Sequence, residues 1–183
     1  MNEDKIGIMP QIEEILLIED NPDDRVLIER ALRKNKAAKS IMTACDGAEA
    51  LDYLFGLESF SGRDTKHMPQ LIVLDLKIPK IDGLGVLETI RNNACTRNIP
   101  VVILTSSDHD RDLVESYQLG ANCYLRKNVD FVGFCETVHQ LLPQLQELVR
   151  KRNAERQNRE TKSGHPAAAD TRHDANTGTG TSP

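Results

Sequence analysis

The sequence of 183 residues contains no tryptophan, and aromatic residues make up only 4% of it. The core must therefore be built mainly from leucine, isoleucine, valine and alanine. No apolar run approaches the ~20 residues that cross a bilayer, so we expect no membrane partner. The formal net charge of −5 shows no excess of basic residues. A broad nucleic-acid-binding surface needs such an excess, so we expect no DNA partner.

Cysteine is also scarce, and its spacing is uninformative for metal binding. The four residues are Cys45, Cys95, Cys123 and Cys135, which do not form the paired ligand spacing of a zinc site. We expect them to be small buried hydrophobes or free thiols in a reducing compartment. The first residues lack a basic segment followed by an apolar one, so we expect no signal peptide and a cytoplasmic protein.

Short apolar runs alternate with helical patterns along most of the chain. The run 71–74 ends on Asp75 and is typical of a strand buried on both faces. We expect five strands, at 15–18, 40–45, 71–75, 101–105 and 122–125, with a helix after each of them. Alternation of this kind predicts an α/β fold with right-handed crossovers and a parallel sheet covered on both faces.

The last expected helix begins near residue 130 and extends beyond the domain that it covers. Its apolar spacing from Phe131 continues through Leu148, which indicates core packing, with a dimer contact as the alternative. Pro143 lies inside this pattern, and an interior proline costs ~3 kcal/mol, so we expect a bend or a restart there. We divide the chain into a flexible leader (1–13), one domain with an extended C-terminal helix (14–150), and a charged, then low-complexity, disordered tail (151–183).

Polar residues follow the apolar runs where the strands end. They are Glu19, Asp20, Asp75, Thr105 and Lys127, and in a parallel sheet these ends share one edge. Close carboxylates repel each other by about 4 kcal/mol per pair at ~4 Å and an effective dielectric constant of ~20. A Mg²⁺ ion would relieve that repulsion. An aspartate at such a site can accept a phosphoryl group, with the hydroxyl and the ammonium stabilising the phosphoryl oxygens.

In this order and on these strand ends, the residues resemble the receiver domain of two-component response regulators, over about residues 14–142. The resemblance is carried by Ile-Glu-Asp-Asn-Pro-Asp-Asp (18–24), Leu-Asp-Leu-Lys-Ile-Pro-Lys-Ile-Asp-Gly (74–83), Ile-Pro-Val-Val-Ile-Leu-Thr-Ser-Ser (99–107) and Leu-Gly-Ala-Asn-Cys-Tyr-Leu-Arg-Lys (119–127). It implies the flavodoxin-like (βα)5 fold, a doubly wound five-stranded sheet of order 2-1-3-4-5. Within the family, the chain is most similar to stand-alone regulators that pair with phytochrome-type histidine kinases.

The resemblance also implies a role for each site residue. The phospho-acceptor is Asp75, and the switch residues are Thr105 and Tyr124. The implied Mg²⁺ ligands are Asp20, Asp75, the backbone carbonyl of Lys77, and Glu19 through a water molecule. The implied function is a single-domain regulator that accepts a phosphoryl group from a histidine kinase and signals through a changed surface. Such a protein catalyses only its own phosphorylation and dephosphorylation. A histidine phosphotransfer protein and a second copy of the chain are further candidate partners.

Two positions depart from the family pattern. Lys77 stands where this subgroup often has asparagine. Asn128 stands where the family usually has a proline preceded by a cis bond. A cis bond before a non-proline residue costs ~3–4 kcal/mol, so we expect the Lys127–Asn128 bond to be trans and the lifetime of the phosphoryl group to be altered.

Two other classes of function compete with this interpretation. One is a receiver-shaped interaction scaffold that works without phosphate. The other is a Mg²⁺-dependent phosphatase or phosphotransferase with an aspartyl nucleophile. Such enzymes generally have a second acid two residues after the nucleophile, where this chain has Lys77, so turnover of small substrates is disfavoured. A flavin site is weaker still, because no strand-end loop is rich in glycine, serine and threonine.

Overall fold

A single parallel sheet forms the centre of the protein. The structure is a computed structural model that describes residues 11–105, 110–127 and 130–163. The strands are β1 (Ile12–Ile18), β2 (Ala38–Ala44), β3 (Leu71–Asp75), β4 (Val101–Thr105) and β5 (Cys123–Arg126). Their order in the sheet is β2-β1-β3-β4-β5, and every neighbouring pair is parallel. The predicted fold class and strand order are confirmed.

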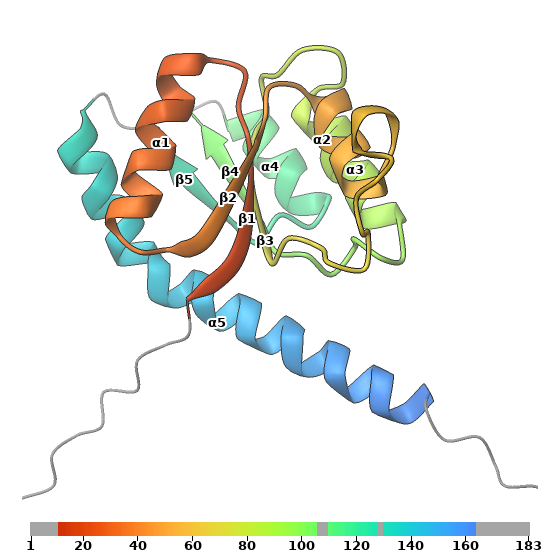
Figure 1. Ribbon diagram of the computed structural model, residues 1–183. Coiled ribbons are helices and arrows are strands. Elements are labelled where there is room, and N and C mark those ends of the chain that lie inside the picture. Colours follow the sequence, from red (N-terminus) through yellow and green to blue (C-terminus); the bar gives the residue numbers. More distant parts are fainter. Residues whose placement is uncertain (1–10, 106–109, 128–129, 164–183) are drawn as a thin grey trace, which may run out of the picture.

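Helices cover both faces of this sheet. They are α1 (Pro22–Lys34), α2 (Gly47–Phe55), α3 (Gly83–Asn92), α4 (Asp110–Gln118) and α5 (Phe131–Ser163), and a short 3-10 turn, η1 (Glu58–Phe60), lies in the loop after α2. In Figure 1, α1 and α5 lie on one side of the sheet, and α2, α3 and α4 lie on the other. This is the doubly wound arrangement that buries both faces of a parallel sheet.

The central strands are continuously apolar because successive side chains enter two different cores. In β1, Ile15 and Leu17 pack in the core under α1 and α5. The alternate residues Leu16 and Ile18 pack in the core under α2 and α3. Every residue of β3 is buried, including Asp75 at its end. A strand with no solvent-facing side leaves polar residues only at its ends, and this places the acids at the edge of the sheet.

Local signals in the sequence fix the segments beside that edge. Asn21 caps α1, because its Oδ1 accepts hydrogen bonds from the backbone amides of Asp23 (2.9 Å) and Asp24 (3.2 Å). Gly83 opens α3 directly against β3, where an added Cβ would lie 2.5 Å from the carbonyl oxygen of Asp75. Any side chain at position 83 would therefore displace the acidic end of β3.

The last helix differs from the prediction in two respects. It continues without interruption from Phe131 to Ser163 through Pro143, so a restart at this proline was wrong, although the ribbon of α5 does bend partway along (Figure 1). Burial of Val138 and Leu145 on either side compensates for the hydrogen bond that the proline cannot make. The helix also includes residues 151–163 of the predicted tail.

The first strand likewise includes Ile12 and Glu13 from the predicted leader. The division of the chain into leader, domain and tail otherwise stays a prediction. The leader residues 1–10, the tail residues 164–183 and the Lys127–Asn128 bond lie outside the described residues. Among the helices that the structure describes, none combines the length and the apolar composition of a membrane span.

The cysteines follow the expectation drawn from their spacing. All four are free thiols. Cys123 and Cys135 are buried and contribute to the core, whereas Cys45 and Cys95 are exposed.

Candidate functional site

Three carboxylates gather at the carboxyl edge of the sheet, as predicted. One oxygen atom from each of Glu19, Asp20 and Asp75 lies within 4.8 Å of the others. The parallel pairing of Ile18 with Leu74 places the first residues beyond β1 beside the end of β3. Glu19 and Asp75 are buried, and Asp20 is exposed. The cluster therefore has a buried floor and one acid facing solvent.

Lys127 inserts its ammonium group into this cluster from the end of β5. Its Nζ lies 2.6 Å from Asp75 Oδ2 and 2.6 Å from Glu19 Oε2. Its backbone amide donates to the carbonyl oxygen of Thr105 at 2.8 Å, which fixes the chain beside β4. Burial opposes the charge of the ammonium, but its contacts with the carboxylates of Asp75 and Glu19 outweigh this effect and raise the pKa of Lys127 above that of an ordinary lysine. The group is therefore a permanent cation.

Glu19 is the most deeply buried member of the cluster. Its side chain is fully buried, and this burial raises the pKa of the carboxyl group despite the opposing effect of Lys127. Its Oε1 accepts from the backbone amide of Asn21 at 3.2 Å. Its Oε2 contacts the lysine ammonium but makes no well-aligned hydrogen bond. The candidate metal ligands at this site are all carboxylate oxygens. A buried carboxylate oxygen that lacks a well-aligned hydrogen bond and lies among them fits a hard cation such as Mg²⁺.

Asp75 is held by two neighbours yet can still be reached. Its Oδ1 accepts from the backbone amide of Lys77 at 2.9 Å, and its Oδ2 contacts Lys127. The side chain keeps 11% of its surface exposed. A carboxylate that is oriented by a backbone amide and opens to solvent can act as a nucleophile toward a phosphoryl donor. Metal ligation by the carbonyl of Lys77 stays a prediction.

The two predicted switch residues lie in different surroundings. Thr105 ends β4, partly buried, directly beside the end of β3. Tyr124 is 47% exposed, and its ring meets the ring of Tyr117 on α4 edge-on at a centroid distance of 6.4 Å. Thr105 thus stands at the acidic edge, whereas Tyr124 lies on the surface between α4 and β5. Their switching roles stay predictions.

One participant in the site was missed from the sequence. Asp24 Oδ2 lies 3.1 Å from the Nζ of Lys127, so a third carboxylate, besides those of Glu19 and Asp75, contacts the ammonium. The signal was present in the cap at Asn21 and the proline that follows it. Together they start α1 immediately after Asp20 and bring the first helical turn over the edge of the sheet.

A doubly wound sheet with an acidic edge, contacted by one lysine, has the residue types that a site for an aspartyl phosphate needs. Comparison with known families agrees, because the model of the response regulator receiver domain matches residues 15–139. The chain belongs to the response-regulator receiver family. It is a receiver-domain response regulator of a two-component system, a class that is phosphorylated on aspartate by histidine kinases.

Three relatives are notably similar to this chain. Response regulator Rcp1 of Synechocystis sp. (strain ATCC 27184 / PCC 6803 / Kazusa) is 37% identical over 114 residues, which cover 62% of this chain and 76% of Rcp1. The crystal structure of its Mn²⁺-bound form is 33% identical, with a TM-score of 0.63 and coverage of 70% and 91%. The structure of the bacteriophytochrome response regulator AtBRR is 45% identical, with a TM-score of 0.61 and coverage of 72% and 94%. The phosphorylated cyanobacterial phytochrome response regulator RcpA is 35% identical, with a TM-score of 0.64 and coverage of 71% and 91%.

The burial of the Glu19 carboxyl group and its raised pKa give a first testable expectation. A raised pKa in the folded state means that this carboxyl group contributes stability only while protonated, at acidic pH, and loses that contribution as the pH rises. We expect Glu19→Gln to raise the free energy of unfolding of the metal-free protein at neutral pH by about 1 kcal/mol. It should also weaken Mg²⁺ binding by about tenfold or more.

Urea unfolding and calorimetric Mg²⁺ titration would measure these two effects. Glu29→Gln is the matched control, because Glu29 is a partly exposed residue of α1 outside the acidic cluster and pairs with Arg33. The stability gain should shrink toward acidic pH, where Glu19 itself becomes protonated. A variant with unchanged Mg²⁺ affinity would contradict a metal-binding role for this residue.

Proposed function

We propose that this protein receives a phosphoryl group on Asp75 from a phytochrome-type histidine kinase and signals by changing its surface. The observation that supports this most strongly is the contact of Lys127 with both Asp75 and Glu19 at 2.6 Å. It places a permanent cation against the acceptor oxygen. The kinase type is supported by the relatives, because AtBRR and RcpA are described as response regulators of phytochromes.

The transfer makes one bond and breaks one. A carboxylate oxygen of Asp75 attacks the phosphorus of a phosphohistidine. The new P–O bond forms as the P–N bond breaks, and the leaving histidine nitrogen keeps the electron pair. Lys127 moves its contact from the carboxylate to a phosphoryl oxygen, and the Lys77 amide holds the acceptor in line. Mg²⁺ bound by Glu19, Asp20 and Asp75 would neutralise the charge of the carboxylates and of the phosphoryl oxygens.

The signal follows from the new charge at the edge of the sheet. The hydroxyl of Thr105 donates a hydrogen bond to a phosphoryl oxygen, and the side chain shifts toward Asp75. Tyr124 then leaves its contact with Tyr117 and turns inward. The surface between α4 and β5 changes shape as a result and selects a different partner. A histidine phosphotransfer protein or a second copy of the chain is a candidate for that partner.

The protein transfers a phosphoryl group to its own carboxylate and does not turn over free substrates as an enzyme does. The position two residues after Asp75 carries Lys77, whose side chain is exposed, so no second acid stands there to protonate a leaving group. We place the protein in the cytoplasm, where the exposed thiols of Cys45 and Cys95 would stay reduced.

Phosphotransfer from two purified kinases would test the proposed partner. One is a bacteriophytochrome kinase, and the other is a histidine kinase with an unrelated sensor domain. We expect transfer from the phytochrome kinase to be at least about tenfold faster, which corresponds to about 1.4 kcal/mol of discrimination. Equal rates would contradict the phytochrome assignment and leave the receiver mechanism in place.

A further inference from the structure

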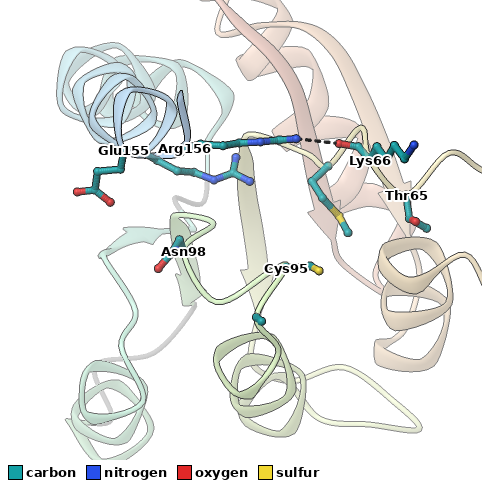
Figure 2. Close-up of a pocket in the computed structure, with 9 residues that line it drawn as sticks. Thr65, Lys66, Cys95, Asn98, Glu155 and Arg156 are labelled. Carbon is teal, nitrogen blue, oxygen red and sulfur yellow. Dashed lines mark hydrogen bonds between the residues drawn. The ribbon is translucent and has the colours of Figure 1, made fainter. Parts of the chain in front are cut away.

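A cavity of about 460 Å³ lies at the end of the sheet opposite the acidic site. The second half of α5 passes beneath the sheet in Figure 1 and forms one wall of this cavity. The other walls come from two loops, as Figure 2 shows. The lining residues come from 65–68, from 94–98 and from 152–156. Far from the acceptor, the chain thus forms an open pocket large enough for a small molecule.

The guanidinium of Arg152 is the dominant charge in this space. It donates to the backbone carbonyl of Pro69 at 3.1 Å. Within the ranges that the structure describes, no carboxylate forms an ion pair with it. Burial, together with the neighbouring charge of Arg156, lowers the pKa of Arg152 to about 10. A half-buried cation that is partly removed from water and paired with one neutral carbonyl is undercompensated.

The surrounding charges reinforce this imbalance. Lys66 and Arg156 also line the cavity, and the one acid in its lining is Glu155. In Figure 2 the carboxylate of Glu155 points away from Lys66 and Thr65 on the opposite wall. Arg156 crosses the cavity to donate to the carbonyl of Lys66 at 3.3 Å. The lining is therefore positive and offers neutral donors besides.

An adjoining hollow of about 320 Å³ is also lined mainly by basic side chains among its charged residues. It shares Asn98, Arg152 and Glu155 with the first cavity and adds the three cations of Arg91, Arg97 and Lys151. The guanidinium of Arg91 is held by neutral acceptors, among them the carbonyls of Ile99 and Gly120, and burial lowers its pKa. Two half-buried guanidiniums with neutral partners thus lie along this edge.

We propose that this cavity binds a small organic anion, whose carboxylate or phosphate group contacts Arg152 and whose apolar part lies against Met68 and Ala94. Charge complementarity selects the anionic group, and the apolar side chains in the lining select an organic body over a bare ion. The ligand would join α5 to the loops at 65–68 and 94–98. Its binding would then stabilise the second half of α5 against the sheet.

Amide chemical shifts of the full chain would test the proposal, measured without Mg²⁺ so that anions are not drawn to the acidic edge. The probes are benzoate and phenyl phosphate, with benzamide as the neutral analogue of benzoate. We expect saturable shifts at residues 65–68 and 94–98 with a dissociation constant of about 1 mM or below for either anion. Benzamide should bind at least about tenfold more weakly. Failure of both anions to shift these residues, or equal binding of benzamide, would overturn the proposal.

Three variants locate the interaction. Arg152→Gln removes the charge and should weaken binding of the anions by at least about tenfold. Ala94→Phe fills the cavity, keeps every charge and should weaken binding to a similar degree. Arg150→Gln is the matched control, because Arg150 is exposed and already paired with Glu147, and it should bind as the unmodified protein does. Unchanged binding in Ala94→Phe, or a loss in Arg150→Gln as large as in Arg152→Gln, would overturn the assignment of the site.

Discussion

Replacing Asp75 with asparagine is expected to abolish phosphoryl transfer from a labelled histidine kinase to this protein. The carboxylate is the proposed nucleophile, and an amide of the same shape cannot form the acyl phosphate. The variant should fold normally, because asparagine can still accept the hydrogen bond from the Lys77 amide. It also removes one charge from a crowded acidic cluster. The measurement is the amount of label on the protein after incubation with the phosphorylated kinase.

The matched control for this result is Asp52→Asn. Asp52 lies on α2, outside the acidic cluster that includes Asp75. The control should accept label at the unmodified rate. Transfer to Asp75→Asn at more than about a hundredth of that rate, a deficit smaller than about 2.7 kcal/mol, would show that another side chain is the acceptor.

Replacing Lys127 with methionine is expected to destabilise the metal-free protein by about 3 kcal/mol at neutral pH. The side chain keeps its length and loses its charge, so Glu19 and Asp75 are left as neighbouring buried carboxylates without a cation. Mg²⁺ should restore much of this loss, because it would supply the missing positive charge. The phosphorylated variant should lack the surface change, since the phosphoryl oxygens lose their partner.

The pH dependence of this deficit follows from two pKa shifts. The pKa of Lys127 is raised, so its contribution to stability is fully present below the ordinary lysine range and disappears only at strongly alkaline pH. At the acid end, the carboxylates that it pairs with become protonated, beginning with Glu19, whose pKa is raised by burial. The difference between the variant and the unmodified protein should therefore be constant around neutrality and shrink as the pH falls into the carboxyl range.

Urea unfolding from neutral to acidic pH, with and without Mg²⁺, would measure this dependence. Lys77→Met is the matched control, because Lys77 also lies next to the acceptor but its side chain is exposed. The control should stay within about 0.5 kcal/mol of the unmodified protein. An equal loss of unfolding free energy in both variants would contradict the inference that the ammonium of Lys127 is the cation that stabilises the buried carboxylates.

Convergence of the acids could be predicted because topology alone enforces it. Apolar runs 15–18 and 71–74 cannot face solvent on either side, so both belong in a buried parallel sheet, and the resemblance to receiver domains implies that they are neighbours in it. Once they are, Glu19 and Asp75 must meet at its edge, whatever the details of packing. The same reasoning placed Lys127 correctly, because β5 also ends at this edge.

Features that depend on side-chain direction and on tertiary packing could not be predicted in this way. The contact of Asp24 with Lys127 requires the exact rotation of the first turn of α1, which the cap at Asn21 sets. The outward position of Tyr124 depends on its contact with a ring from α4. The length of α5 was underestimated because its charged second half has little amphipathic signal. Packing of Val149 and Arg152 against the rest of the chain holds that half in place.

Intact-protein mass after treatment with phosphoramidate, a small phosphoryl donor, tests the central claim most directly. Without any kinase, the account predicts the gain of one phosphoryl group in the presence of Mg²⁺ and almost none when the metal is chelated. Peptide mapping should locate that group in the segment that contains Asp75. No gain with Mg²⁺, or a gain on a different segment, would contradict the assignment of Asp75 and its acidic neighbours as the phosphoryl-acceptor site.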